Sequence, residues 1–127
     1  MISKSPVILM IDDDKHLLEI YKARLEKEGF KVLLSESGDK ALQMLLKLKP
    51  DLITLDIVMP GKDGIETLKL IKEVRATANI PVLMLSTLSD KGYIKKALDL
   101  GAIEYLLKAH AKPGDLITKI KAVLHLT

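Results

Sequence analysis

Acidic, hydroxyl and amino side chains stand at the ends of four apolar runs in this 127-residue chain. They are Asp12 and Asp13 after residues 7–11, Asp56 near the end of 51–57, Ser86 at the end of 81–86, and Lys108 at the end of 104–108. If the first and third runs are neighbouring strands, Asp12, Asp13 and Asp56 converge, and three carboxylates that close repel one another. A hard divalent cation with oxygen ligands removes this repulsion, and Mg²⁺ is the usual ion where few protein ligands must leave room for water and phosphate. The residue types therefore indicate a cation site at one edge of a sheet.

Each of these residues also has an ordinary structural role. Asp14 fits the N-cap of a following helix, and the helix dipole would favour Asp12 and Asp13 at the same place. Asp56 could cap the turn after its strand, while the hydroxyl and amino groups could be turn and surface residues. Taken together, these roles require four independent coincidences at the same end of the sheet, so the pattern favours a shared site.

Two alternating patterns along the chain must position these groups. Short apolar runs of strand length, typical of a parallel sheet covered on both faces, occupy residues 7–11, 31–36, 51–57, 81–86 and 104–108. Segments with helical spacing lie between and after them, at residues 15–29, 39–49, 64–76, 90–101 and 114–126. Five β-α units predict a single open α/β sheet with helices on both faces. In such a sheet, ligands bind beyond the carboxyl ends of the strands.

Cap and turn residues mark the expected boundaries of these elements. Helix starts are expected at the N-caps Asp39 and Asp90, and helix stops at Gly29 and Gly101. The Met-Pro-Gly run at 59–61 predicts a tight turn, because proline fixes φ and glycine relieves steric crowding. That turn would give the strand end before it a rigid support.

The composition excludes several classes of protein. The chain has no cysteine, so disulfides, thiol catalysis and cysteine-ligated zinc are excluded. It has four aromatic residues and scattered lysines with a net charge of +3, so we expect no direct binding of nucleic acid. No apolar run approaches the roughly 20 residues that span a bilayer. Acids follow the first apolar stretch at once, which disfavours a signal peptide, and the cytoplasm is the expected compartment.

The ordered motifs ILMIDDD, LITLDIVMPGKDG, VLMLST and GAIEYLLK resemble those of the receiver domain of two-component response regulators. The resemblance covers residues 7–126 and implies a single receiver domain over 1–127. It implies a doubly wound, flavodoxin-like α/β fold, with a five-stranded parallel sheet in the order 2-1-3-4-5 flanked by five helices. The last expected helix runs to the end of the chain, so we expect either a single-domain regulator or the receiver part of a longer protein.

The resemblance implies a role for each matching acid. Asp56 would be the phosphoacceptor, taking a phosphoryl group from the phosphohistidine of a sensor histidine kinase or a phosphotransfer protein. Mg²⁺, or Mn²⁺ in its place, would be held by Asp12, Asp13, Asp56 and the backbone carbonyl of Val58.

The resemblance also implies how the site would respond to phosphorylation. Ser86 would donate a hydrogen bond to a phosphoryl oxygen, and Lys108 would pair with Asp56 or its phosphoryl group. Tyr105 matches the family's switch aromatic, which turns inward when the serine moves, although an ordinary half-buried strand tyrosine is an equal alternative.

Phosphorylation would then shift a pre-existing equilibrium in the face formed by the expected helix 90–101, strand 104–108 and helix 114–126. A downstream output protein or output domain would read that face. We expect a monomer, or a weak homodimer formed through the same face, and no contact with a membrane.

The chain departs from the family's pattern around the site. Ala109 follows Lys108 where receiver domains usually have proline, and a cis bond before alanine would cost about 3 kcal/mol, so we expect a trans bond and a differently shaped loop. The two flanking positions that tune hydrolysis in the family are Val58 and Leu88 here. Neither side chain can orient an attacking water, which predicts a long-lived phosphoaspartate.

Other functions remain open at this point. We expect this chain to be a signalling phosphoacceptor rather than an ordinary enzyme, although it would support its own phosphotransfer and slow autodephosphorylation. One alternative is an interaction module of the same fold that works without phosphorylation. Another is a Mg²⁺-dependent phosphohydrolase with an aspartyl-phosphate intermediate, which would need a second aspartate where Val58 stands. A flavin or nucleotide module would need a phosphate-cradling loop, yet acids that repel phosphate stand at 12–14.

Overall fold

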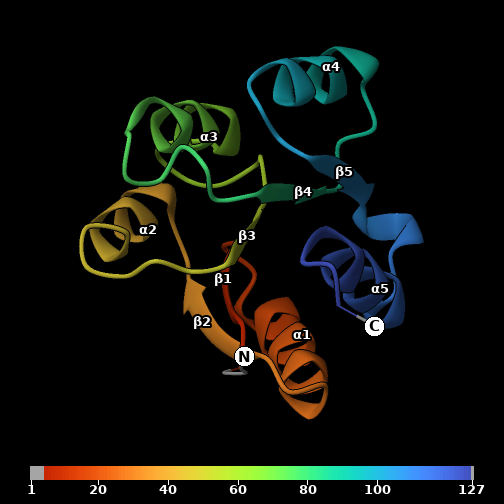
Figure 1. The fold of residues 1–127 in the computed structure, drawn as a ribbon. Coiled ribbons are helices and arrows are strands. Elements are labelled where there is room, and N and C mark those ends of the chain that lie inside the picture. The colour runs from red at the N-terminus through yellow and green to blue at the C-terminus, as the bar shows by residue number, and fades with distance from the viewer. Residues whose placement is uncertain (1–4, 127) are drawn as a thin grey trace.

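The computed structural model describes residues 5–126, and its elements alternate between strands and helices (Figure 1). They are β1 (Val7–Ile11), α1 (Lys15–Lys27), β2 (Lys31–Ser35), α2 (Gly38–Met44), β3 (Leu52–Leu55), α3 (Gly64–Glu73), β4 (Val82–Ser86), α4 (Lys91–Asp99), β5 (Glu104–Leu107), the 3₁₀ turn η1 (Lys108–His110) and α5 (Pro113–Val123). The strands form one parallel sheet in the order β2-β1-β3-β4-β5, which confirms the expected fold. The expected single domain over 1–127 extends beyond the described residues at both ends and stays a prediction.

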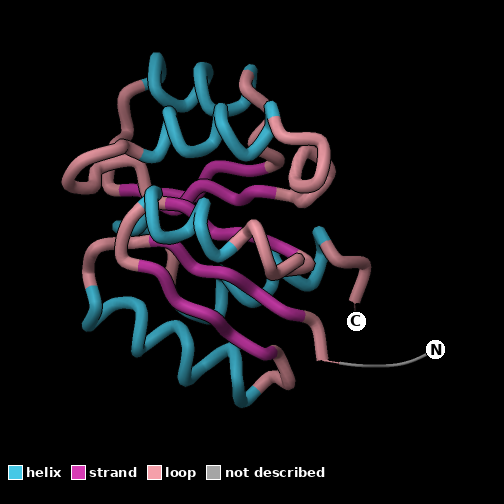
Figure 2. Tube along the Cα trace, turned by 90° about the vertical axis from the view of Figure 1, so that its left-hand side faces the viewer, coloured by secondary structure: helices cyan, strands magenta, loops and turns pink. Residues whose placement is uncertain are grey.

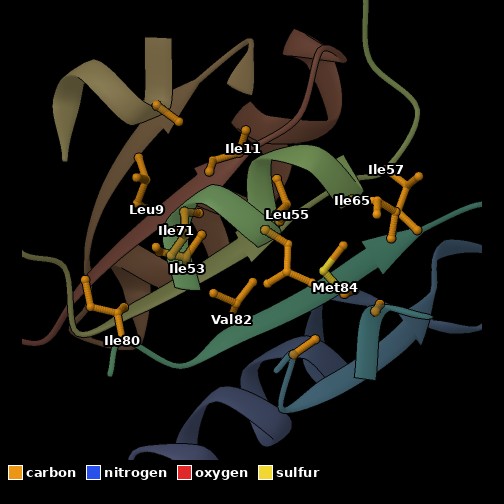
Figure 3. Close-up of a cluster of buried hydrophobic side chains, with 14 of the residues drawn as sticks. Leu9, Ile11, Ile53, Leu55, Ile57, Ile65, Ile71, Ile80, Val82 and Met84 are labelled. Atoms are coloured by element: carbon orange, nitrogen blue, oxygen red, sulfur yellow. The ribbon is translucent and has the colours of Figure 1, made fainter. Parts of the chain in front are cut away.

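The sheet lies between two layers of helices. Helices α2, α3 and α4 cover one face, and α1 and α5 cover the other (Figures 1 and 2). Because successive side chains of a strand point to opposite faces, Leu9 and Ile11 of β1 pack under the first layer, whereas Ile8 and Met10 pack under the second. Figure 3 shows the first of these two cores, which is built almost entirely of aliphatic side chains. Both faces of every central strand are therefore buried, as the near-continuous apolar runs predict.

The register of the sheet brings the ends of neighbouring strands to one edge. In β1, Ile11 is paired with Ser35 of β2 and with Leu55 of β3. Further along the strand order, Ser86 of β4 is paired with Leu107 of β5. The residues that follow Ile11, Leu55 and Leu107 in the chain thus emerge at the same edge, where chemistry-bearing side chains are expected.

Most of the expected helix starts agree with the structure. Asp14 caps α1, its Oδ1 accepting a hydrogen bond from the Leu17 N–H at 3.1 Å, and Asp90 caps α4. Asp39 as an N-cap is wrong. Ser37 caps α2 instead, because its extended backbone lets its Oγ accept a hydrogen bond from the N–H of Lys40 at 3.1 Å, and the helix begins one residue before Asp39.

Several helices and strands are shorter than the sequence pattern suggests. Helix α2 ends at Met44 rather than at 49, and residues 45–47 form a turn before Pro50. Helix α3 ends at Glu73 because Val74 adopts an extended backbone, and α5 ends at Val123 rather than at 126. Strand β3 spans only Leu52–Leu55, within the expected 51–57.

Two further expectations concern the backbone and membranes. No cis peptide bond occurs in residues 5–126, so the bond between Lys108 and Ala109 is trans, as expected, and the loop there forms the 3₁₀ turn η1. None of the described helices is long and apolar enough to cross a bilayer.

Candidate functional site

Two buried carboxylates follow the adjacent strands β1 and β3. Asp12 and Asp56 are 4% and 5% exposed, respectively. Backbone hydrogen bonds continue the sheet through both residues: the Asp12 N–H donates to the Ser35 carbonyl and the Asp56 N–H donates to the Ile11 carbonyl, each at 3.0 Å. The sheet itself therefore fixes the positions of the two carboxylates, as the convergence of strand ends predicts.

Asp13 completes an acidic cluster with these two residues. One carboxylate oxygen from each of Asp12, Asp13 and Asp56 lies within 4.8 Å of the other two. Asp13 is exposed, so the cluster opens to solvent on its side. Three hard oxygen donors with an open side fit a divalent cation such as Mg²⁺, which keeps several waters when it binds proteins.

Lys108 reaches this cluster from the end of β5. Its Nζ lies 2.6 Å from Asp12 Oδ2 and 3.3 Å from Asp56 Oδ2. The pairing of Lys108 with Asp56 was expected from the sequence, whereas its shorter pairing with Asp12 was not. No spacing signal could have revealed that preference, because it depends on how the side chains pack at the edge of the sheet.

The pKa shifts at the site follow from this packing. Burial raises the pKa of Asp56 above its ordinary value, and the positive charge of Lys108 offsets only part of that effect. Burial alone would lower the pKa of Lys108, but its hydrogen bond to Asp12 and the charges of Asp56 and Asp12 together raise it. Lys108 is therefore a firmly protonated cation, whereas Asp56 is a carboxylate with too little charge compensation.

The turn after β3 holds Asp56 from the other side. The Ile57 N–H donates to Asp56 Oδ1 at 2.8 Å, and the Gly64 N–H donates to the Ile57 carbonyl at 2.8 Å. A Cβ on Gly64 would overlap the carbonyl oxygen of Asp56 and lie 2.6 Å from the Ile57 Cα, so only glycine allows this approach. Val58 is 56% exposed beside this turn, and its carbonyl as a metal ligand stays a prediction.

Ser86 and Tyr105 both hold the loop after β4. The Leu88 N–H donates to Ser86 Oγ at 3.2 Å, and Tyr105 Oη donates to the Leu88 carbonyl at 2.8 Å. Ser86 is fully buried and Tyr105 is half-buried, and burial raises the pKa of the tyrosine. No hydrogen bond joins Ser86 to the carboxylates within the part of the chain that the structure describes. Both residues are thus linked to one loop residue, Leu88, and their switching roles stay predictions.

The arrangement defines a class of protein: a flavodoxin-like α/β domain with an acidic cluster and a lysine beyond the carboxyl ends of β1, β3 and β5. Residues 8–121 match the family described as the response regulator receiver domain. The chain belongs to this family.

Curated relatives and solved structures agree with that assignment. The chain is 41% identical over 117 residues to the transcriptional regulatory protein CpxR of Klebsiella pneumoniae, covering 92% of this chain and 48% of CpxR. It is 34% identical over 120 residues to the phosphate regulon transcriptional regulatory protein PhoB of Pseudomonas aeruginosa, covering 94% of this chain and 52% of PhoB. The chain thus spans about half the length of these curated relatives.

Among solved structures, a CheY-like response regulator receiver domain protein from Methanospirillum hungatei superimposes with a TM-score of 0.90 at 28% identity, covering 96% of this chain and 95% of that one. The chain is therefore a receiver domain of two-component signalling in both sequence and fold.

Proposed function

We propose that Asp56 accepts a phosphoryl group from a phosphohistidine on a sensor histidine kinase or a histidine phosphotransfer protein. The supporting observation is the position of its carboxylate, buried at a strand end beside two other acids and 3.3 Å from the Lys108 amine. A carboxylate oxygen of Asp56 attacks phosphorus, the bond between phosphorus and the imidazole nitrogen breaks, and its electron pair leaves with the imidazole. Such a reaction depends mainly on positioning and charge neutralisation.

The proposed reaction depends on Mg²⁺, or on Mn²⁺ in its place. Asp12, Asp13, Asp56 and the Val58 carbonyl would hold the ion, which supplies charge neutralisation at the phosphoryl oxygens when bound. The acidic cluster supports this proposal, because its oxygen atoms match the preference of hard divalent cations.

Lys108 and Ser86 both contact the phosphoryl group in this proposal. The Lys108 ammonium pairs with the phosphoryl group during its transfer and afterwards on Asp56, and the Ser86 hydroxyl donates a hydrogen bond to a phosphoryl oxygen. Movement of Ser86 changes the hydrogen bond that it accepts from Leu88, the residue whose carbonyl also holds Tyr105. The shared contact supports Tyr105 as the residue that passes the change to β5.

The output of this switch is the face formed by α4, β5 and α5. We propose that a downstream protein or output domain reads this face, and that the chain is a monomer or a weak homodimer through it. We also propose a cytoplasmic location, one receiver domain over 1–127, and no direct binding of nucleic acid by this chain. The family assignment supports a signalling domain rather than an ordinary enzyme.

The test is to incubate the protein with Mg²⁺ and acetyl phosphate and to measure its intact mass. Wild type is expected to gain one phosphoryl group, and Asp56→Asn is expected to gain none. Equal gain by the variant, or no gain by wild type, overturns the proposal. A wild type that gains nothing yet binds its output partner would instead favour an interaction module that works without phosphorylation.

A further inference from the structure

A buried hydrogen bond joins α1 to the connection between β5 and α5. Tyr21 Oη donates to the Ala111 carbonyl at 3.1 Å, across 90 residues of sequence. Tyr21 is 3% exposed and Ala111 is also buried, and both belong to the core beneath α1 and α5. A buried tyrosine hydroxyl needs a partner, and here the partner lies in the segment that begins with Lys108.

That connection has little internal support. It contains the single 3₁₀ turn η1, and the bond that closes the turn, from the Ala111 N–H to the Lys108 carbonyl, is long at 3.4 Å. Ala109 and His110 are exposed between them. At the far end, the Lys112 N–H donates to Asp115 Oδ2 at 2.9 Å and so belongs to the start of α5. Ala111 is therefore the residue through which this connection is anchored to the core.

Tyr21 and Lys108 are also coupled electrostatically. Burial raises the pKa of Tyr21, the positive charge of Lys108 lowers it, and the charge of Asp12 raises it. The charges of Lys108 and Asp12 thus both act on the Tyr21 phenol. Removal of the Tyr21 hydroxyl would free the Ala111 carbonyl, which lies three residues after Lys108 in the chain.

We propose that the Tyr21 hydroxyl is a positioning group for Lys108. By holding the Ala111 carbonyl against α1, it fixes the connection that follows Lys108 and keeps the ammonium between Asp12 and Asp56. The functional consequence rests on the proposed phosphoacceptor role of Asp56, whereas the placement of Lys108 does not.

The first experiment is a double-mutant cycle on the rate of phosphorylation by acetyl phosphate with Mg²⁺. Tyr21→Phe keeps the ring and is expected to slow phosphorylation by roughly ten-fold, the scale of a small misplacement of a catalytic group. In a Lys108→Ala background, adding Tyr21→Phe is expected to change nothing, because the group that the tyrosine positions is gone. A Tyr21→Phe variant as fast as wild type, or equal slowing in both backgrounds, overturns the proposal.

A matched control separates positioning from loss of a buried hydrogen bond. Thr77 is also buried, and its Oγ1 donates to the Ile71 carbonyl at 2.6 Å, before β4 and so at the opposite end of the sheet. Thr77→Val is expected to lower Tm about as much as Tyr21→Phe while leaving the phosphorylation rate unchanged. If Thr77→Val slows the reaction as much as Tyr21→Phe, the effect is one of general stability and the proposal fails.

A second measurement does not require phosphorylation. In the unmodified protein, Tyr21→Phe is expected to shift the NMR signals of the Lys108 side chain and of the 109–112 amides, while Thr77→Val leaves them in place. Unchanged Lys108 signals in Tyr21→Phe reject the positioning role even if the wild type is readily phosphorylated. A wild type that accepts no phosphoryl group rejects the function of Asp56, and the NMR result still decides the placement of Lys108.

Discussion

Among the described residues, Lys108 is the only cation that forms an ion pair with Asp12 or Asp56. Its amine lies nearer to Asp12 than to Asp56. The buried carboxylate of Asp56 is therefore only partly compensated by this one positive charge. A buried charge without full compensation destabilises the folded state. At the scale of single residues, the charges of the site are therefore unbalanced, and this imbalance has measurable consequences.

The first prediction concerns the stability of the metal-free protein. Because burial raises the pKa of Asp56 in the folded state, the folded protein binds a proton there more tightly than the unfolded chain. Stability must then fall as pH rises from the unfolded pKa through the folded pKa, and the loss is complete above the latter. Asp56→Asn removes this loss, while Lys108 keeps its bond to Asp12.

We expect Asp56→Asn to raise the free energy of unfolding by about 1 kcal/mol at pH 7 with a chelator present, and by less as the pH falls toward the pKa of Asp56. Urea unfolding at several pH values measures both. Asp14→Asn is the matched control, because asparagine caps helices about as well as aspartate. A destabilised Asp56→Asn at neutral pH would show that the ion pair with Lys108 outweighs burial.

The second prediction concerns the lifetime of the phosphorylated state. Val58 is exposed beside Asp56 and has no polar atom in its side chain to orient water. Val58→Asn is expected to speed the loss of the phosphoryl group by on the order of ten-fold, since positioning a reactant commonly has at least this effect. The decay of the phosphorylated mass with Mg²⁺ measures it. Val74→Asn, at the exposed end of α3, should decay like wild type, and equal decay of all three proteins would contradict the prediction.

At the scale of elements, the start of α3 is pressed against the strand end that carries Asp56. Gly64→Ala would force a Cβ into the backbone of Asp56 and Ile57, and we expect a loss of about 2–3 kcal/mol of stability from this overpacking. Urea unfolding measures the loss. Gly114→Ala is the control, because its Cβ would meet no atom within 4 Å, so it should be neutral or slightly stabilising. Similar stabilities for the two variants would show that α3 can move away without cost.

The elements also show what the sequence could and could not predict. All five strands and five helices were predictable because near-continuous apolar runs alternate with helical spacing. Several of their boundaries were not, because these depend on local competition between possible caps and turns. Ser37 and Asp39 are both good caps by type, and only the observed backbone decides between them. The convergence of Asp12, Asp13 and Asp56 was predictable, because the carboxyl ends of parallel strands meet at the same edge of the sheet.

Contacts between side chains distant in sequence were beyond prediction. The preference of Lys108 for Asp12 and the bond from Tyr21 to Ala111 depend on how whole helices pack across the sheet, and neither leaves a spacing signal. The Gly64 contact had only a weak signal, an Asp-Gly pair that also suits an ordinary helix start.

At the scale of the whole molecule, a metal ion bound by the acidic cluster would add to the stability of the fold. An ion that binds only the folded state stabilises it by about 2.7 kcal/mol at a concentration 100 times its Kd. We expect Mg²⁺ to raise the Tm of wild type, and to raise that of Asp13→Asn much less, because Asp13 is an exposed member of the cluster whose replacement should leave the fold intact. Thermal unfolding with NaCl at matched ionic strength is the control. An equal rise in both proteins would mean that the ion acts elsewhere.

Contacts between residues far apart in the sequence also affect the order in which the site is assembled. The bond between Lys108 and Asp56 spans 52 residues, and the bond between Tyr21 and Ala111 spans 90. Contacts this distant in sequence form late, since the chain must first close the intervening loops. A chain still emerging from the ribosome would already carry all three carboxylates but not the lysine beside them. Under the proposed role of Asp56, a kinase that meets an unfinished or partly unfolded copy would find the acceptor without its lysine, so efficient phosphorylation would be restricted to chains in which Lys108 has reached the acidic cluster.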